Sequence, residues 1–181
     1  MRSIYLSAGH HLKDSGAIGN GYKENTLNIE LRDLVIERIK QLKPNQKVIK
    51  DDDKETLSQV VSRFRKTIKP DDFWLEFHFD SSGNGTASGT TSLVKEGANS
   101  KSKEVGAELS KMVSSVLNIM DRKVKSEKDS NRGRLAMLHV TENSVLLEVG
   151  FISNKLDMSE YAEWKYWVSD EIARIVIKAV S

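Results

Sequence analysis

The chain has 181 residues, of which 38% are hydrophobic and 30% are charged, and it contains no cysteine. These values fit one globular domain with a sizeable core, and they exclude disulfide frameworks, thiolate metal sites and cysteine nucleophiles. The formal net charge of +2 gives no basic footprint of the size that a nucleic-acid-binding protein needs, so nucleic acid is not an expected partner.

The first element is a short apolar run, SIYLSA at residues 3–8, and Gly9 follows it. This pattern predicts a buried strand. Gly9, His10 and His11 interrupt the run too early for a signal-peptide core or a membrane-spanning helix. We therefore expect a chain that is made in the cytoplasm without a signal peptide and does not insert into a membrane.

The rest of the chain alternates between helical and strand-like patterns. Leucines spaced along residues 24–42 predict a helix, and Thr56 with Gln59 predicts a capping box at the start of another. The final helix is predicted to carry Trp164, Trp167, Val168, Ile172, Ile175 and Val176 on one side. The other predicted elements are strands at 47–50, 71–80, 90–95 and 144–151, a turn region at 81–89, a helix over 105–120, and a polar segment at 121–134 with a short strand around Val124.

This alternation predicts an α/β fold: a single domain of residues 1–181 with a mostly parallel or mixed twisted sheet, flanked by helices on both faces. Ligands of such sheets bind at the carboxyl ends of the strands. His10 follows the first strand, and His78 and Glu148 lie near the ends of two others. Glu24, which opens the first helix, is expected at the same edge.

Two histidines and one glutamate form a common ligand set of catalytic zinc sites. His10, Glu24 and His78 fit this set, although they come from three separate elements and their spacing alone is a weak signal. The alternative is that both histidines only form hydrogen bonds in or near the core.

Glu148 lies in VLLEVGF, a run that would otherwise be buried on both faces. A buried carboxylate is costly unless it is paired or contacts a metal ion. One interpretation is a salt bridge to Arg132 or Arg134. The other is a general base that activates water.

Four segments together, IYLSAGH, GAIGNGYKEN, FHFDSS and VLLEVGFISN, resemble in order and spacing the zinc-dependent N-acetylmuramoyl-L-alanine amidases of cell-wall hydrolases and phage endolysins. The resemblance runs from residue 3 to the final helix. It implies that His10, Glu24 and His78 bind one Zn²⁺ per chain and that Glu148 is the catalytic glutamate.

The resemblance also implies the reaction, hydrolysis of the amide between N-acetylmuramic acid and L-alanine in peptidoglycan. Glycan strand and stem peptide would lie in an open groove, for which Ser81–Gly89, Arg132 and Arg134 are candidate lining residues. No separate wall-binding domain is expected, and the chain would act on the cell wall after release, as an endolysin does. The pattern makes no prediction of an oligomeric state.

Three other functions compete with this interpretation. A zinc peptidase could cut within the stem peptide, and an inactive glycan-binding module could keep the fold, although such a module has no reason to bury Glu148. A nucleotide-binding protein is disfavoured, because the first loop lacks both the phosphate-binding Gly-Lys-Ser/Thr ending and a G-x-G-x-x-G pattern.

Two residues depart from the family pattern. His11 stands where the family usually has glycine; adjacent side chains of an extended chain point to opposite sides, so we expect His11 at the rim. Glu76 stands where many relatives have serine, and it either orients the imidazole of His78 or forms a structural ion pair.

Four other polar residues receive structural roles. Asp14 and Asp80 lie in turn-prone loops, where a carboxylate commonly stabilises the turn. Asn154 is predicted to cap the final helix, and His139 is predicted to be structural.

Overall fold

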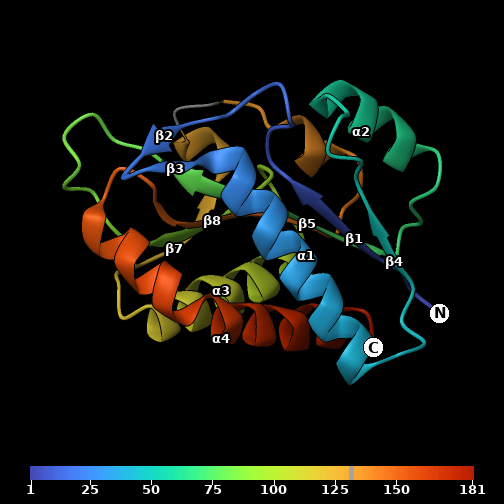
Figure 1. Cartoon of the computed structure of the whole chain (residues 1–181). Coiled ribbons are helices and arrows are strands. Elements are labelled where there is room, and N and C mark those ends of the chain that lie inside the picture. The colour runs from blue at the N-terminus through green and yellow to red at the C-terminus, as the bar shows by residue number, and fades with distance from the viewer. Residues whose placement is uncertain (131–132) are drawn as a thin grey trace.

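The computed structural model describes residues 1–130 and 133–181, which form an α/β fold around one six-stranded sheet (Figure 1). The strand order is β4-β1-β5-β8-β6-β7. Only the pairing of β6 with β8 is antiparallel among the described strands of this sheet. The predicted fold class is therefore confirmed. The strands are β1 (Ile4–Ala8), β4 (Val48–Lys50), β5 (Phe73–Asp80), β6 (Thr90–Val94), β7 (Asp121–Ser126) and β8 (Ser144–Phe151).

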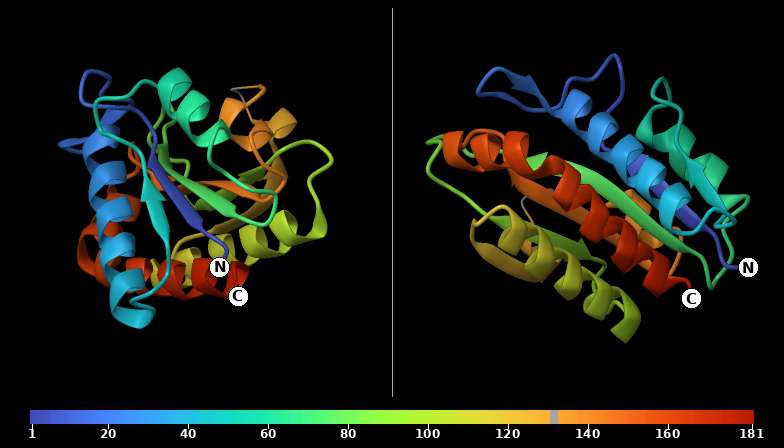
Figure 2. Two further views of the ribbon diagram at one scale, coloured as in Figure 1. Left: turned by 90° about the vertical axis from the view of Figure 1, so that its right-hand side faces the viewer. Right: turned by 60° about the horizontal axis from the view of Figure 1, so that its bottom comes forward.

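Helices cover both faces of the sheet unequally. Figure 2 shows the long helices together on one side of the sheet, and a shorter helix lies on the other side. The long helices are α1 (Glu24–Leu42), α3 (Ser100–Val116) and α4 (Lys155–Ala179), and the shorter one is α2 (Leu57–Arg65). The short 3₁₀ turn η2 (Ala136–His139) shares the side of α2, and a second such turn, η1 (Glu127–Asp129), follows β7. None of the described helices is long and apolar enough to cross a membrane.

The central strand β5 distributes its side chains between these two sides because successive residues of a strand alternate. Phe73, Leu75, Phe77 and Phe79 join the large core beneath α1, α3 and α4. Trp74 joins the smaller core beneath α2 and η2. Residues 76 and 78 share the side of Trp74, so the chemically active side chains of β5 lie on the α2 side of the sheet.

Two predicted caps are confirmed. Thr56 and Gln59 form a reciprocal capping box at the start of α2. Asn154 accepts hydrogen bonds from the backbone N–H groups of Leu156 and Asp157 at the start of α4.

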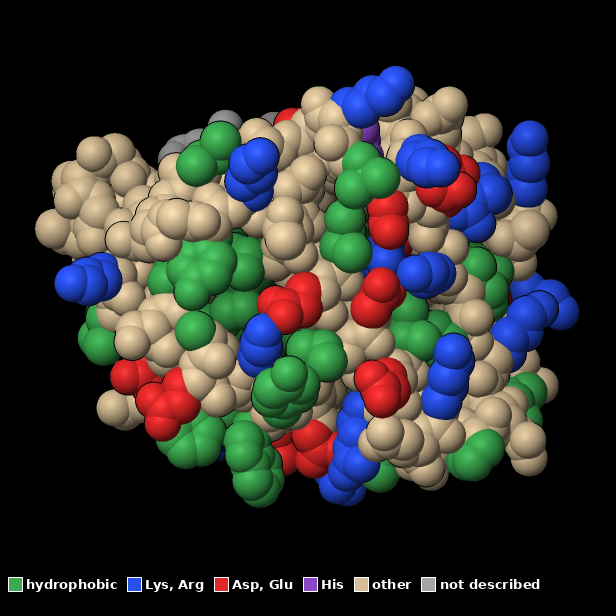
Figure 3. Space-filling model, viewed as in Figure 1, with side chains coloured by type: hydrophobic (Ala, Val, Ile, Leu, Met, Phe, Trp, Pro, Cys, Tyr) green, Lys and Arg blue, Asp and Glu red, His purple; other side chains and the backbone are tan. Residues whose placement is uncertain are grey.

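The prediction for the buried side of α4 was wrong at two positions. Val168, Ile172, Ile175 and Val176 are buried, but Trp164 is 37% exposed and Trp167 is 61% exposed. Hydrophobic side chains are visible at the surface over this helix in Figure 3. Tyr161 before these two residues and Val168 after them are buried, so the helix stays on the core here. At about 100° per residue, Trp164 lies at the edge of the buried face and Trp167 lies outside it.

The first loop contains a hairpin that the sequence analysis missed. Strands β2 (Ile18–Gly19) and β3 (Tyr22–Lys23) pair in antiparallel fashion. Asn20 and Gly21 between them both have positive φ, the conformation that a two-residue hairpin turn requires. The signal was present as an Asn-Gly pair.

Candidate metal centre and catalytic site

His10 lies directly after β1 in a strained backbone conformation, with φ of 68°. Such a conformation is uncommon for a residue with a Cβ and persists where the surroundings enforce it. The flanking backbone is held by α1. The buried amide of Asn28 donates to the carbonyl of Gly9 at 2.9 Å, and the amide of Asn25 donates to the carbonyl of His11 at 3.0 Å.

Two glycines let the backbone approach the site closely. A Cβ atom at Gly9 would lie 2.2 Å from the ring of His78, and a Cβ atom at Gly16 would lie 2.6 Å from both Glu24 Oε2 and the ring of His10. Gly16 also has a φ of 61°. Neither position accepts a side chain without displacing the histidines or Glu24.

The structure brings together the three predicted ligand residues. Glu24 Oε1 lies 2.9 Å from His78 Nδ1, and Glu24 Oε2 lies 3.1 Å from His10 Nε2. One potential ligand atom from each residue lies within 4.8 Å of the others. Ligand atoms on two zinc bonds of about 2.1 Å at a tetrahedral angle are about 3.4 Å apart. The spacing therefore suits a small divalent cation.

A carboxylate holds the second ring nitrogen of each histidine. His10 Nδ1 lies 2.8 Å from Asp14 Oδ2, and His78 Nε2 lies 3.2 Å from Glu76 Oε1. Because an ionised carboxylate only accepts hydrogen bonds, Asp14 and Glu76 favour an N–H on the outer nitrogen of each ring. Glu24 also only accepts, so the inner nitrogens carry a proton as well, which a bound cation would displace to use the inner lone pair. Such an arrangement of outer carboxylates is typical of metal-binding histidines.

Glu76 and Asp14 thus both contact the cluster. Glu76 Oε2 accepts a 2.7 Å hydrogen bond from the hydroxyl of Ser7, which accepts one from the indole of Trp74. No described lysine or arginine pairs with Glu76, which favours the orienting role over the structural ion pair. Asp14 does stabilise its turn, through the N–H of Gly16, but its contact with His10 was not predicted.

The electrostatics of the cluster favour a cation. The hydrogen bond to Glu24 raises the pKa of His10 against the effect of burial. Burial alone would lower the pKa of His78, but its hydrogen bonds to Glu24 and Glu76 raise that pKa to about 10. Burial opposes ionisation of Glu24, yet the two histidines hold its pKa well below the usual range. Positive charge is therefore stabilised at the point where the three side chains meet.

Glu148 stands beside His78 on the neighbouring strand. The two residues are in register between β5 and β8, and Glu148 is 3% exposed. Its negative charge contributes to the raised pKa of His78. Glu148 lines a cavity of about 150 Å³ together with Asp80, Arg122 and Lys125. Of its two predicted salt-bridge partners, Arg134 is exposed and Arg132 lies outside the described residues.

A second cavity, of about 280 Å³, opens over His10 and His78. His11 lines it without joining the cluster, as predicted, although the reason is the left-handed backbone at His10 rather than an extended chain. The loop at residues 81–89, a candidate for the substrate groove, lines neither this cavity nor that of Glu148. It lies instead against the start of α4, where the hydroxyl of Ser88 donates to Asp157.

The remaining two polar residues, Asp80 and His139, were predicted to have structural roles. Asp80 Oδ1 accepts from the N–H of Ser81, as a turn carboxylate does. His139 contacts Glu127 at 2.8 Å and lies away from the cluster, so its predicted structural role is confirmed.

Comparisons with known proteins identify the family of the chain. The N-acetylmuramoyl-L-alanine amidase family matches residues 4–180. Protein YqiI of Bacillus subtilis strain 168, itself uncharacterized, is 30% identical over 169 residues, which cover 91% of this chain and 77% of YqiI.

Solved structures share the fold. The catalytic domain of CwlV, an N-acetylmuramoyl-L-alanine amidase from Bacillus (Paenibacillus) polymyxa var. colistinus, is 25% identical, with a TM-score of 0.76 over 99% of this chain and 96% of that domain. A putative N-acetylmuramoyl-L-alanine amidase from Neisseria meningitidis is 22% identical, with a TM-score of 0.78 over 98% of this chain and 94% of the other. The match over nearly the whole chain shows that the protein belongs to the N-acetylmuramoyl-L-alanine amidase family and is an enzyme that acts on peptidoglycan.

Proposed function

We propose that the protein is a zinc-dependent hydrolase that cuts the amide between the lactyl group of N-acetylmuramic acid and the L-alanine of the stem peptide. The observation that carries the proposal is the convergence of His10, Glu24 and His78, with a carboxylate behind each histidine. These three residues would hold the ion. Bound zinc supplies Lewis acidity, which polarises a carbonyl and makes water more acidic.

Glu148 acts as the general base in this proposal. Its carboxylate accepts a proton from the attacking water and then delivers it to the leaving amine of L-alanine. Support comes from its burial and from its position in register with His78. Asp14 and Glu76 keep both imidazoles in the orientation and tautomer that present a lone pair to the ion. No covalent intermediate on the protein is needed.

The test measures the release of L-alanine amino termini from purified peptidoglycan, with and without a chelator, for the natural chain and for Glu148→Gln. We expect chelation to abolish release and zinc to restore it. Glu148→Gln should lose about 10²–10⁴-fold in rate while it still binds one zinc per chain, because general acid–base catalysis contributes about that much. New amino termini from residues other than L-alanine would instead identify a stem-peptide peptidase.

We also propose a lytic role outside the membrane, after release from the cell that makes the protein. Each cut detaches a cross-linking peptide from its glycan strand, so repeated cuts weaken the wall. Purified protein added to cells with an exposed wall should lower their turbidity, and Glu148→Gln should not. Peptidoglycan cleavage without loss of turbidity would favour wall remodelling.

A further inference from the structure

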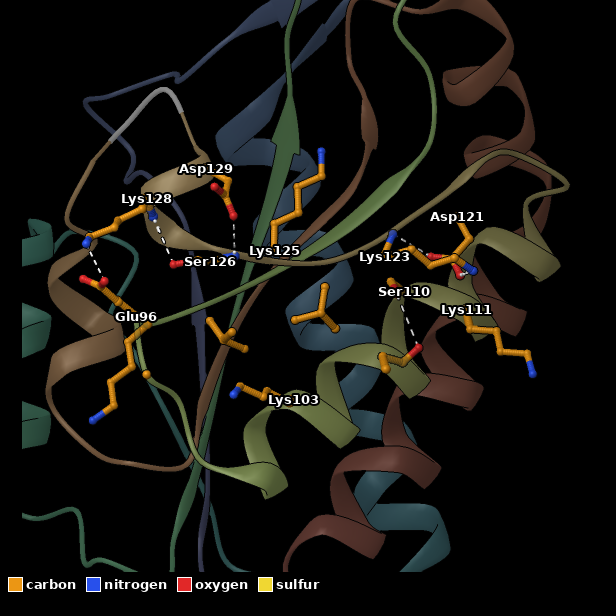
Figure 4. A pocket seen from close by; sticks show the side chains of 15 residues that line it. Glu96, Lys103, Ser110, Lys111, Asp121, Lys123, Lys125, Ser126, Lys128 and Asp129 are labelled. Carbon is orange, nitrogen blue, oxygen red and sulfur yellow. Dashed lines mark hydrogen bonds and ion pairs between the residues drawn. The ribbon is translucent and has the colours of Figure 1, made fainter.

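A large cavity lies away from the metal cluster. It is a groove of about 750 Å³ between α3, the edge strand β7 and the segment that follows β6 (Figure 4). We call it the basic groove because six lysines line it, against three carboxylates, which are Glu96, Asp121 and Asp129. The surplus of three positive charges exceeds the net charge of +2 of the whole chain. The lysines are Lys95, Lys103, Lys111, Lys123, Lys125 and Lys128.

Half of these lysines have no acidic partner within the described part of the chain. Lys123 pairs with Asp121, Lys128 with Glu96, and Lys95 with Glu142 outside the groove. Lys103, Lys111 and Lys125 form no ion pair or hydrogen bond with a described side chain. Lys103 and Lys111 both project from α3, eight residues and so about 12 Å apart along the helix axis. The groove thus presents separated, unneutralised ammonium groups along its length.

The backbone of β7 is poorly suited to pair with an added peptide strand. β7 is the last strand of the sheet, so one of its edges is open. Its residue Lys123 has a φ of 70°, which breaks the regular strand geometry. The N–H of Lys123 donates to Asp121, and the N–H of Ser126 lies 3.3 Å from Asp129. Because these two donors are used within the chain, the edge of β7 is less available to pair with a peptide backbone, and the charged side chains remain the main feature of the groove.

The uncharged residues that line the basic groove narrow the choice of ligand further. Val94, Ala107 and Val124 supply apolar surface between the lysines. None of the described lining side chains is aromatic, and single-stranded nucleic acids are usually bound by stacking their bases on aromatic rings. A flexible chain of short aliphatic units joined by phosphodiesters needs only cations and apolar contact.

We propose that the basic groove binds a polyol-phosphate polymer, an anionic chain of the kind attached to bacterial cell walls. Point-like ammonium groups suit phosphates that are free to adjust their spacing along a flexible chain. The groove adjoins the cavity of Glu148, because Lys125 and Asp129 line both. If the proposed amidase function holds, a wall polymer bound in the groove keeps the enzyme at its substrate.

The experiment measures sedimentation of the protein with purified cell walls that carry polyol phosphate and with the same walls after hydrofluoric acid has removed it. The variant is Lys103→Gln with Lys111→Gln, which removes two unpaired charges from α3 without altering a residue near the metal cluster. The matched control is Lys40→Gln with Lys47→Gln, which removes two exposed lysines elsewhere. Soluble poly(glycerol phosphate) serves as a competitor at several salt concentrations.

We expect the natural chain to bind intact walls more tightly than stripped walls and the competitor to release it. The groove variant should bind intact walls about thirtyfold more weakly, which corresponds to about 2 kcal/mol, with a shallower dependence on salt. The control pair should bind like the natural chain. Release of L-alanine amino termini from stripped walls should be equal in all three proteins, which separates this proposal from the amidase function.

Three results would overturn the proposal. Equal binding to intact and stripped walls would mean that peptidoglycan itself is the ligand. Equal weakening by the control pair would mean that only net charge matters. Single-stranded DNA that competes as well as poly(glycerol phosphate) would make the groove a general polyanion site rather than one for this polymer.

Discussion

Two regions of the molecule place histidine against a buried glutamate, and they differ in how many imidazoles face the carboxylate. Both carboxylates accept two backbone N–H groups: Glu24 from Ala17 at 2.9 Å and Phe79 at 3.3 Å, and Glu127 from Leu135 at 2.7 Å and Glu96 at 3.2 Å. Glu24 also directs one oxygen to each of two imidazoles. Glu127 contacts one imidazole, that of His139.

The comparison shows that residue type alone does not identify a metal centre. At Glu24, Asp14 and Glu76 take the outer nitrogens of the two histidines, and the inner nitrogens converge on the carboxylate. Glu127 faces one imidazole, that of His139, so two side chains meet there instead of three. The first region can exchange protons for a cation held by three ligands, whereas the second offers only two.

The largest difference should appear when each carboxylate is replaced by its amide. Glu24→Gln removes a ligand charge from the metal cluster, and we expect zinc to fall below about one tenth of an equivalent per chain and amide hydrolysis to fall roughly 10³-fold. Glu127→Gln should keep both. Zinc content and amine release of the two purified variants provide the measurement, and loss of zinc in both would remove the distinction.

The outer carboxylates should have an intermediate effect. Asp14→Asn and Glu76→Gln keep the size of each side chain but weaken its hold on the N–H of the histidine. We expect each to lower zinc affinity about 10–100-fold, the range typical of such outer partners. Competition with a chromogenic chelator measures this affinity. Unchanged affinity in both variants would show that the ring orientations are fixed by packing alone.

Much of this arrangement could be predicted from the sequence because strand ends fix it. His10, His78 and Glu148 follow or lie near the ends of apolar runs, and parallel strands bring such positions to one edge. The role of Asp14 could not be predicted in the same way. It depends on the left-handed backbone at His10, which is imposed by contacts with Asn25 and Asn28 of α1.

Two other features depend on packing that periodicity does not describe. Trp164 and Trp167 lie between the buried Tyr161 and Val168 but beside the face that those residues share, and whether such flanking positions are covered depends on the neighbouring elements. Arg32 is fully buried in α1 and pairs with Asp51 at 2.7 Å, a contact between helix and loop that no local pattern marks.

His139→Gln and Glu127→Gln each disturb a buried, hydrogen-bonded cluster, and we expect Glu127→Gln to lower the free energy of unfolding by about 1–3 kcal/mol. Urea denaturation of metal-free protein at pH 7 provides the measurement. Removal of the metal before unfolding matters, because a bound ligand would stabilise the native state by mass action. A midpoint equal to that of the natural chain would mean that the amide introduced by Glu127→Gln keeps the same donors satisfied.

The smallest effect is the pH dependence of this loss of stability. It tests whether the ionised carboxylate of Glu127 is what stabilises the fold. Burial would raise the pKa of Glu127, but the N–H groups of Leu135 and Glu96 and the contact with His139 outweigh it and hold that pKa below the usual value. The unfolded chain therefore binds the proton more readily than the folded one. The stabilisation is complete above the unfolded pKa of about 4.3 and is lost as pH falls through the lower folded value.

We therefore expect the gap in the free energy of unfolding between the natural chain and Glu127→Gln to be constant from pH 7 to about pH 5 and to narrow below it. His139 is the titratable side chain facing Glu127, so His139→Gln serves as the control: the narrowing should persist there, because the backbone donors remain. A gap that stays constant down to about pH 3 would show that the ionised form of Glu127 is not what stabilises the fold.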